Sequence, residues 1–203
     1  MFLRTYSWSI YASVLLCLAS GYVITGGLHI DGLMDTFDGI FAGEKKRLKA
    51  MKDSKVGSFG VQSIDFITLN QIACLLKIHT QIIFVLPICL FWGRFSNLFF
   101  IDQFNYLSYK KKSISHKKCW KGFTKESLIS IVFLIIFITY QCILLNSEQT
   151  LIKNLFLLLI GCFISYKIPN ILGKKIGGFN GDACGASVVI VETAMLFIHA
   201  ILL

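Results

Sequence analysis

The chain has 203 residues, of which 55% are hydrophobic and only 15% are charged, and its mean hydropathy is +0.69. A soluble domain of this length usually carries about 25% charged residues, so the composition argues against a soluble globular protein. The charged residues also fall in short dense blocks between long apolar runs, which is the pattern of membrane spans joined by loops. A soluble helical bundle would need a polar face on each helix, and the run 127–145 has almost none.

The net charge of +9 and the seven cysteines argue against two further classes of protein. In a membrane chain an excess of lysine marks cytoplasmic loops and anionic lipid headgroups, so we expect membrane lipid as a partner and no nucleic acid. The cysteines are scattered and form no C-x-x-C pair. Their spacing therefore indicates neither a disulfide framework nor a zinc site.

The apolar runs predict an all-α, polytopic integral membrane bundle of about six transmembrane helices. Each run is close to the ~20 residues that cross the hydrocarbon of a bilayer. The second run is the least apolar, because it contains Asp65, Asn70 and Gln71. We expect residues 1–203 to form a single membrane domain. The predicted spans are 8–28, 56–76, 80–101, 127–145, 151–169 and 183–203.

The distribution of basic residues predicts the orientation of these spans. Segments 29–55, 102–126 and 170–182 are rich in lysine, whereas the two short connections between them hold one basic residue each, Lys77 and Lys153. Six spans place the three basic segments on the same side, which the positive-inside rule makes cytoplasmic. We therefore expect a protein of a bacterial or archaeal cytoplasmic membrane with its active site on the cytoplasmic face.

The most informative motif follows the first predicted span. Asp31, Asp35 and Asp38 stand at i, i+4 and i+7, which places all three on one stripe of a helix. Such like charges repel unless a cation lies against them, and Mg²⁺ suits carboxylates when a diphosphate completes its ligands. The alternative is that these side chains only solvate a helix end. His29 either packs or caps the helix, or acts as a general base or phosphate contact.

Two further polar segments carry candidate residues. In segment 51–60, glycines permit close backbone approach to a ligand and lysines offer positive charge to phosphate: Gly57, Gly60, Lys52 and Lys55. Asp53 and Ser54 are predicted to cap the second span. In segment 177–186, a tight glycine turn opens the last span with N–H groups that can face an anion: Gly177, Gly178 and Gly181. Asp182 is either the N-cap of that helix or a further ligand.

Two charged residues lie inside predicted spans. Glu192 lies ten residues beyond Asp182, ~15 Å along the last helix. A carboxylate at that depth should be paired or functional. Arg94 is its candidate partner, although Arg94 could also extend to the membrane surface or meet substrate phosphates.

Three motifs together resemble the cobalamin synthases, or adenosylcobinamide-GDP ribazoletransferases. They are GLHIDGLMDTFDG at 27–39, MKDSKVGSFG at 51–60 and GGFNGDACGA at 177–186. The sequence departs from the family pattern at Asn180, where threonine is usual, and at Val189, where an acidic residue is expected. Family members typically begin with roughly one more helix before the first motif, so the resemblance implies that this chain lacks it.

The resemblance implies a Mg²⁺-dependent membrane transferase. It joins adenosylcobinamide-GDP and α-ribazole (or its 5′-phosphate) into adenosylcobalamin (or its 5′-phosphate) and GMP. We assign the metal to Asp31, Asp35, Asp38 and Asp182, and proton transfer to His29 or Asp53. Substrate contacts are assigned to Lys52, Lys55, Gly57, Gly60, Arg94, Gly177, Gly178 and Gly181.

Two alternatives belong to other families. A CDP-alcohol phosphotransferase also uses an aspartate cluster, but its motif pairs Asp-Gly with Ala-Arg and a later Gly-x-x-x-Asp-x-x-x-Asp, which this sequence lacks. A cation transporter would use Asp65 and Glu192 as an ion path near the middle of the membrane. The enzyme hypothesis instead expects its carboxylates at the cytoplasmic mouth.

Overall fold

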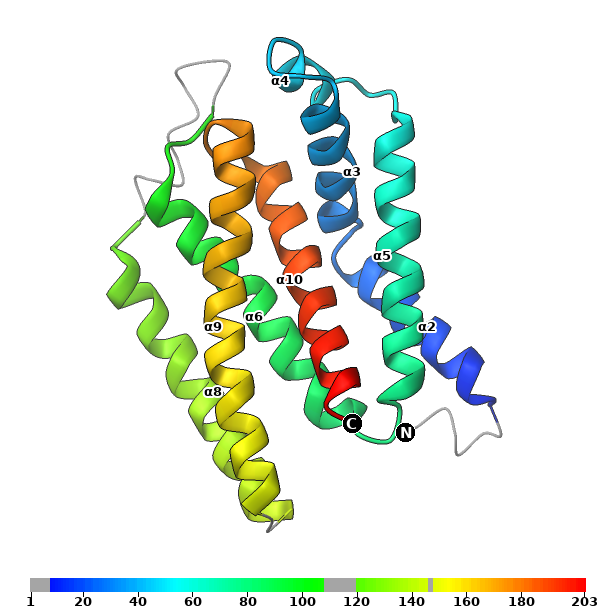
Figure 1. The fold of residues 1–203 in the computed structure, drawn as a ribbon, viewed down its shortest axis with the longest axis vertical. Helices are drawn as coiled ribbons and strands as arrows, with labels where there is room; N and C mark the ends of the chain where they lie inside the picture. The colour runs from blue at the N-terminus through cyan, green and yellow to red at the C-terminus, as the bar shows by residue number, and fades with distance from the viewer. Residues whose placement is uncertain (1–7, 108–119, 146–147) are drawn as a thin grey trace.

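The computed structural model describes residues 8–107, 120–145 and 148–203, which form a bundle of α-helices (Figure 1). The predicted all-α fold is confirmed. Within the described residues, the extended structure is an isolated bridge between Tyr106 and Phe179. The helices are α2 (Ile10–Ile24), α3 (Leu28–Phe41), α4 (Arg47–Ala50), α5 (Ser58–Lys77), α6 (Ile82–Gln103), α8 (Phe123–Leu145), α9 (Glu148–Ile176) and α10 (Gly181–Ile201).

Five helices are long and apolar enough to cross a membrane: α5, α6, α8, most of α9, and α10. A sixth span results if α2 and α3 count as one broken span, so the predicted number is confirmed. The predicted end of the fifth span at Pro169 is wrong, because α9 continues to Ile176. Pro169 is fully buried. Packing by neighbouring helices holds α9 together although proline removes one backbone hydrogen bond.

The prediction of one uninterrupted first span over 8–28 is also wrong. The chain bends by 83° between α2 and α3. The N–H of Gly26 donates to Val23 O and the N–H of Gly27 donates to Tyr22 O, which is the hydrogen-bond pattern of a Schellman motif. Both glycines have positive φ, +62° and +72°, a conformation that other residues rarely adopt. The glycine pair therefore ends α2 and redirects the chain into α3.

Helix α10 occupies the centre of the bundle, between α9 and α6 on one side and α3 and α5 on the other (Figure 1). Its first half is built from small and β-branched residues, including Ala183, Ala186 and Val188, all of which are fully buried. Small residues let neighbouring helix backbones approach closely, which is how membrane helices gain packing energy. α10 is therefore the element against which the others are positioned.

Two glycines set the distance between α3 and α10. A Cβ added at Gly32 would lie 2.6 Å from the carbonyl oxygen of Asp182, and one added at Gly185 would lie 3.2 Å from the Cα of His29. A contact of 2.6 Å with backbone leaves no room for a side chain at Gly32. The two helices therefore touch backbone to backbone, which brings Asp182 next to the aspartate stripe of α3.

As predicted, the described basic connections between helices lie at one end of the bundle. The α9–α10 turn, which follows Lys174 and Lys175, lies at the same end of the bundle as the basic α4 (Figure 1). Lys77 ends α5 at the opposite end, where α9 also begins close to Lys153. Residues 108–119 of the predicted basic loop lie outside the described residues. The described connections thus follow the alternation that six spans require.

We expect Gly32→Ala to lower the thermal unfolding midpoint by about 2–12 °C. The added methyl group forces α10 away from α3; such overpacking costs ~1–3 kcal/mol, and each kcal/mol shifts the midpoint by ~2–4 °C. Circular dichroism of the detergent-solubilised protein measures the change. Leu28→Ala is the control on the same helix, because its side chain is 71% exposed. An unchanged midpoint for Gly32→Ala would show that the crossing is looser than we describe.

Candidate active site

Helix α3 carries the three motif aspartates on one stripe, as their spacing predicts: Asp31, Asp35 and Asp38. α3 has 14 residues, fewer than the ~20 that cross the hydrocarbon. Its stripe is level with the first turns of two spanning helices, because Asp38 contacts Gly60 of α5 and Gly32 packs against Asp182 of α10. The carboxylates therefore lie beside the first turns of α5 and α10.

Asp182 joins this stripe from α10 to make a cluster of four carboxylates, which we call the acidic cluster: Asp31, Asp35, Asp38 and Asp182. Burial is the main cause that raises the pKa of Asp35 to about 6, and the charges of Asp31, Asp182 and Asp38 raise it further. Lys52 is close enough to Asp182 to interact with it electrostatically. The packing of α10 against α3 thus brings four carboxylates together.

The acidic cluster does not form a complete metal site on its own. Among the described residues, no three His, Cys, Asp or Glu side chains converge closely enough to hold a metal ion by themselves. Mg²⁺ is commonly bound by one or two carboxylates, with water and substrate phosphates as its other ligands. A metal ion held at this cluster would need such further ligands.

Asp38 holds the beginning of α5. Its Oδ2 accepts the N–H of Gly57 at 2.7 Å and its Oδ1 accepts the N–H of Gly60 at 2.8 Å. The first N–H groups of a helix have no partner within the helix, and the positive end of the helix dipole favours a carboxylate there. Asp38 therefore caps α5 from another helix. The prediction that Asp53 or Ser54 caps α5 is wrong, because the N-cap residue is Gly57 and no side chain of this loop bonds to it.

The close backbone approach predicted at Gly57 and Gly60 is present, and the group that approaches is Asp38. A Cβ at Gly60 would lie 2.6 Å from Asp38 Oδ2. The preceding loop is exposed at Lys52 and Lys55. Asp53 Oδ1 accepts the N–H of Lys55 at 3.1 Å, which stabilises a local turn. Asp38 thereby positions a lysine-bearing loop beside the acidic cluster.

Asn180 positions Asp182. Asn180 Oδ1 accepts the N–H of Ala183 at 2.9 Å, and its Nδ2 donates to Asp182 Oδ2 at 3.0 Å. The alternative that Asp182 is the N-cap is therefore wrong, and its carboxylate is available to the acidic cluster. Threonine is also a good N-cap residue, so the departure from the family pattern at Asn180 retains the cap.

The predicted glycines of the α9–α10 turn have different surroundings. Gly178 packs against the neighbouring chain segment, since a Cβ there would lie 2.6 Å from Asn105 O. Phe179 extends this contact, because its N–H donates to Asn105 O at 3.0 Å and its O accepts the N–H of Leu107 at 2.8 Å. Gly177 has a φ of +88°, and Gly181 has open space around it. Gly177 and Gly181 both have open space around them, so of the three only Gly178 is closed to a ligand by packing.

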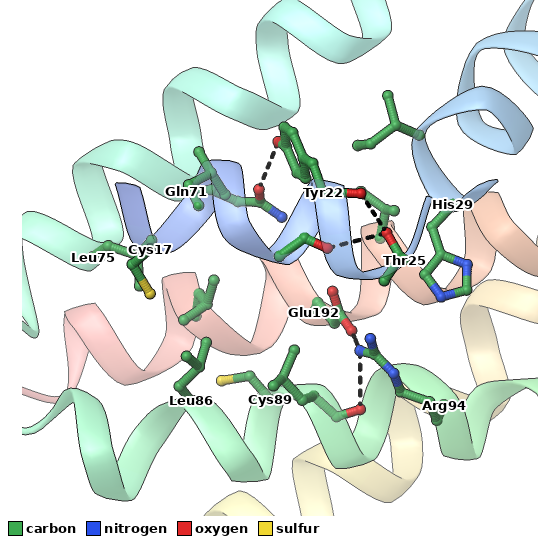
Figure 2. Close-up of a pocket in the computed structure, with 16 residues that line it drawn as sticks. Cys17, Tyr22, Thr25, His29, Gln71, Leu75, Leu86, Cys89, Arg94 and Glu192 are labelled. Atoms are coloured by element: carbon green, nitrogen blue, oxygen red, sulfur yellow. Dashed lines mark hydrogen bonds and ion pairs between the residues drawn. The ribbon is translucent and has the colours of Figure 1, made fainter. Parts of the chain in front are cut away.

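His29 lies at the border between the acidic cluster and a cavity (Figure 2). Arg94 and Glu192 form an ion pair beside it, which confirms the pairing considered from the sequence. His29 is half-buried and lines the same cavity as this ion pair. It therefore stands between the acidic cluster and the cavity.

The cavity contains polar residues that the motifs do not single out. Tyr22 Oη donates to Gln71 Oε1 at 3.1 Å (Figure 2). Gln71 Nε2 donates in turn to Thr193 Oγ1 at 2.9 Å. The one available signal was the low hydropathy of the second predicted span, which includes Gln71. Hydropathy marks Gln71 as unusual but does not show which cavity it faces.

Comparison with known families decides between the hypotheses. A family profile described as cobalamin-5-phosphate synthase matches residues 1–200. The chain belongs to the cobalamin-5-phosphate synthase family. This membership confirms the resemblance carried by the three motifs and favours neither the CDP-alcohol phosphotransferase nor the transporter. Asp65, which the transporter hypothesis places in the ion path, is exposed on the surface of α5.

Several relatives in this family carry the name adenosylcobinamide-GDP ribazoletransferase. The protein of Prochlorococcus marinus strain SARG is 42% identical over 97% of this chain and 76% of its own length. That of Prochlorococcus marinus strain MIT 9303 is 37% identical over 97% of this chain and 76% of its own. That of Trichormus variabilis is 32% identical over 92% of this chain and 73% of its own. No solved structure matches the chain.

In this member of the cobalamin-5-phosphate synthase family, two aspartates one helical turn apart should affect stability in opposite directions. Asp38→Asn should lower the unfolding midpoint by about 3–8 °C, because an amide cannot accept both N–H groups of α5. Asp35→Asn should raise it by about 1–4 °C, because it relieves repulsion among carboxylates. Both are measured in chelator, with Glu44→Gln as the exposed control. A loss of equal size in both variants would contradict the distinction.

The rise in the unfolding midpoint expected for Asp35→Asn should depend on pH. A raised pKa means that the folded protein binds this proton more tightly than the unfolded chain, so stability falls as Asp35 ionises. This loss of stability develops as the pH rises from about 4 to about 6. At about pH 4 the wild type and Asp35→Asn should unfold at the same temperature, and above about pH 6 the variant should be more stable. Midpoints measured across this range and up to about pH 8 in chelator test this, and a difference independent of pH would refute it.

Proposed function

We propose that this chain is the membrane transferase that attaches the lower ligand of cobalamin. It joins adenosylcobinamide-GDP to α-ribazole, or to its 5′-phosphate, and releases GMP. The observation that carries the proposal is the acidic cluster, which the three family motifs bring together at one end of the spanning helices. Membership of the family supports it, because relatives named for this reaction are up to 42% identical.

We propose Mg²⁺ as the partner of the acidic cluster. The four neighbouring carboxylates, of which Asp31, Asp182 and Asp38 add to the effect of burial in raising the pKa of Asp35, suit a divalent cation shared with a diphosphate. Asp31, Asp35 and Asp182 would hold the ion, whereas both oxygens of Asp38 already accept N–H groups of α5. Bound there, Mg²⁺ would offset the charge of the diphosphate and of the leaving GMP.

The chain's own residues would then bind and orient the reactants. Lys52 and Lys55 lie on the exposed loop beside the cluster and attract the phosphates as point charges. The ribose hydroxyl oxygen attacks the phosphorus that bears the cobinamide oxygen, and the bond from this phosphorus to the bridging oxygen breaks. GMP leaves with the bridging oxygen.

His29 is the better candidate for the proton of the ribose hydroxyl. A ring nitrogen of its imidazole would accept this proton as the new bond forms and later release it to water. Asp53 is exposed and its Oδ1 is bonded within its own turn, so it is less suited to this role. His29 also lies nearer the acidic cluster in sequence, two residues before Asp31.

We further propose that the acidic cluster faces the cytoplasm from the cytoplasmic membrane. The cluster lies at the end of the bundle that carries α4 and the α9–α10 turn, and the lysines of these connections favour the inner side of a membrane. The opposite end carries Lys77 and Lys153. This orientation also places the site on the side where nucleotide substrates are made.

We expect activity to require a divalent cation and three carboxylates. Excess chelator should abolish turnover and Mg²⁺ should restore it, while Ca²⁺ should substitute poorly because it is larger and less strictly octahedral. Asp31→Asn, Asp35→Asn and Asp182→Asn should each lower kcat about a hundredfold or more, the scale of lost transition-state stabilisation.

The assay is steady-state turnover of adenosylcobinamide-GDP and α-ribazole, scored by both cobalamin and GMP. Glu44→Gln is the control, because Glu44 is exposed and belongs to none of the three motifs. Undiminished turnover in excess chelator would refute the metal proposal. Wild-type kinetics in all three aspartate variants would refute the site.

A further inference from the structure

The cavity beside His29 has the size of a small aromatic molecule. It has a volume of about 120 Å³ and is enclosed by α2, α3, α5, α6 and α10 (Figure 2). An apolar cavity of ~150 Å³ is large enough to bind benzene. The present cavity is somewhat smaller than this, so a flat ring system would enter it in part and extend through its open side.

Most of the cavity wall is apolar. It is formed largely by Leu18, Leu75, Leu86, Leu90, Val189 and Leu196. Several polar groups in the wall are already engaged: Tyr22 and Gln71 bond to each other, Gln71 also bonds to Thr193, and Arg94 pairs with Glu192. A ligand with many hydrogen-bonding groups would lose its bonds to water here without replacement. The wall therefore favours a weakly polar, flat ring.

The cavity adjoins the acidic cluster. His29 and Ile30 line it and directly precede Asp31 on α3. Val189 lines it from α10, seven residues and hence ~10 Å beyond Asp182. A molecule whose ring fills the cavity can therefore place an attached sugar at the carboxylates.

Only one part of the proposed substrates matches these properties. The corrin ring of cobinamide is far larger than the cavity, and guanine carries several donors and acceptors that the wall leaves unpaired. The benzimidazole base of α-ribazole is flat and mostly apolar, and its ribose carries the attacking hydroxyl. We propose that this cavity binds the base of α-ribazole, and that Leu86 and Cys17 in its wall limit which bases are accepted. The assignment rests on the proposed function.

Filling the cavity should weaken the binding of α-ribazole selectively. Leu86 and Cys17 are partly exposed, so a larger side chain at either position enters the cavity without displacing the core. Leu86→Phe and Cys17→Phe should each raise the KM for α-ribazole at least tenfold. The KM for adenosylcobinamide-GDP should stay within twofold and kcat within threefold. Leu86→Ala should improve the use of ribosides with bulkier bases.

Calorimetric titration of α-ribazole into the full-length protein in detergent provides a readout without turnover. The wild type should bind, and both phenylalanine variants should bind at least tenfold more weakly. Ile83→Phe is the control, because Ile83 lies on the same helix α6, is 57% exposed and does not line the cavity. Unfolding midpoints close to that of the wild type confirm that each variant is folded.

The outcomes separate this inference from the function on which it rests. A wild-type protein that forms neither cobalamin nor GMP would refute the function. Suppose instead that the wild-type protein is active and that both phenylalanine variants keep its KM and affinity for α-ribazole. This result would refute only the assignment of the cavity. Release of a co-purified lipid by Leu86→Phe, with no change in α-ribazole binding, would identify the cavity as an acyl-chain site instead.

Discussion

The backbone contact between α3 and α10 is the constraint on which the site depends. Gly32 lies so close to Asp182 that no side chain fits between them, and this contact joins residues about 150 positions apart in the sequence. Because Asp182 sits in the first turn of α10, the contact adds a fourth carboxylate to the three of α3. The charge density of the acidic cluster is therefore a consequence of helix packing.

Such a cluster is unfavourable on its own, and the fold holds it in place from two directions. Asp38 uses both of its oxygens to cap α5, which anchors one end of the stripe and offsets part of its charge with the dipole of α5. Asn180 caps α10 and bonds to Asp182, which orients the other side. Repulsion from the neighbouring carboxylates remains at Asp35 and adds to the effect of burial on its pKa.

Several features of the fold followed from hydropathy and charge, since a bilayer imposes the length of its spans and the side on which lysines collect. Hydropathy failed at the first span, because apolar residues continue through Gly26 and Gly27 while the backbone turns by 83°. It failed again at Pro169, where buried packing extends α9 to Ile176. Backbone conformation ends the first helix and buried packing extends α9, and average hydropathy reports neither backbone conformation nor packing.

The sequence by itself determined the helical stripe of Asp31, Asp35 and Asp38, because spacing along a helix is a local property. The three motifs also indicated the family. Only the tertiary structure decided that Asp38 caps α5, that Asn180 and not Asp182 caps α10, and that His29 borders an apolar cavity. Each of these depends on contacts between helices distant in the chain, and the partners of a carboxylate or the walls of a cavity cannot be read from residue spacing.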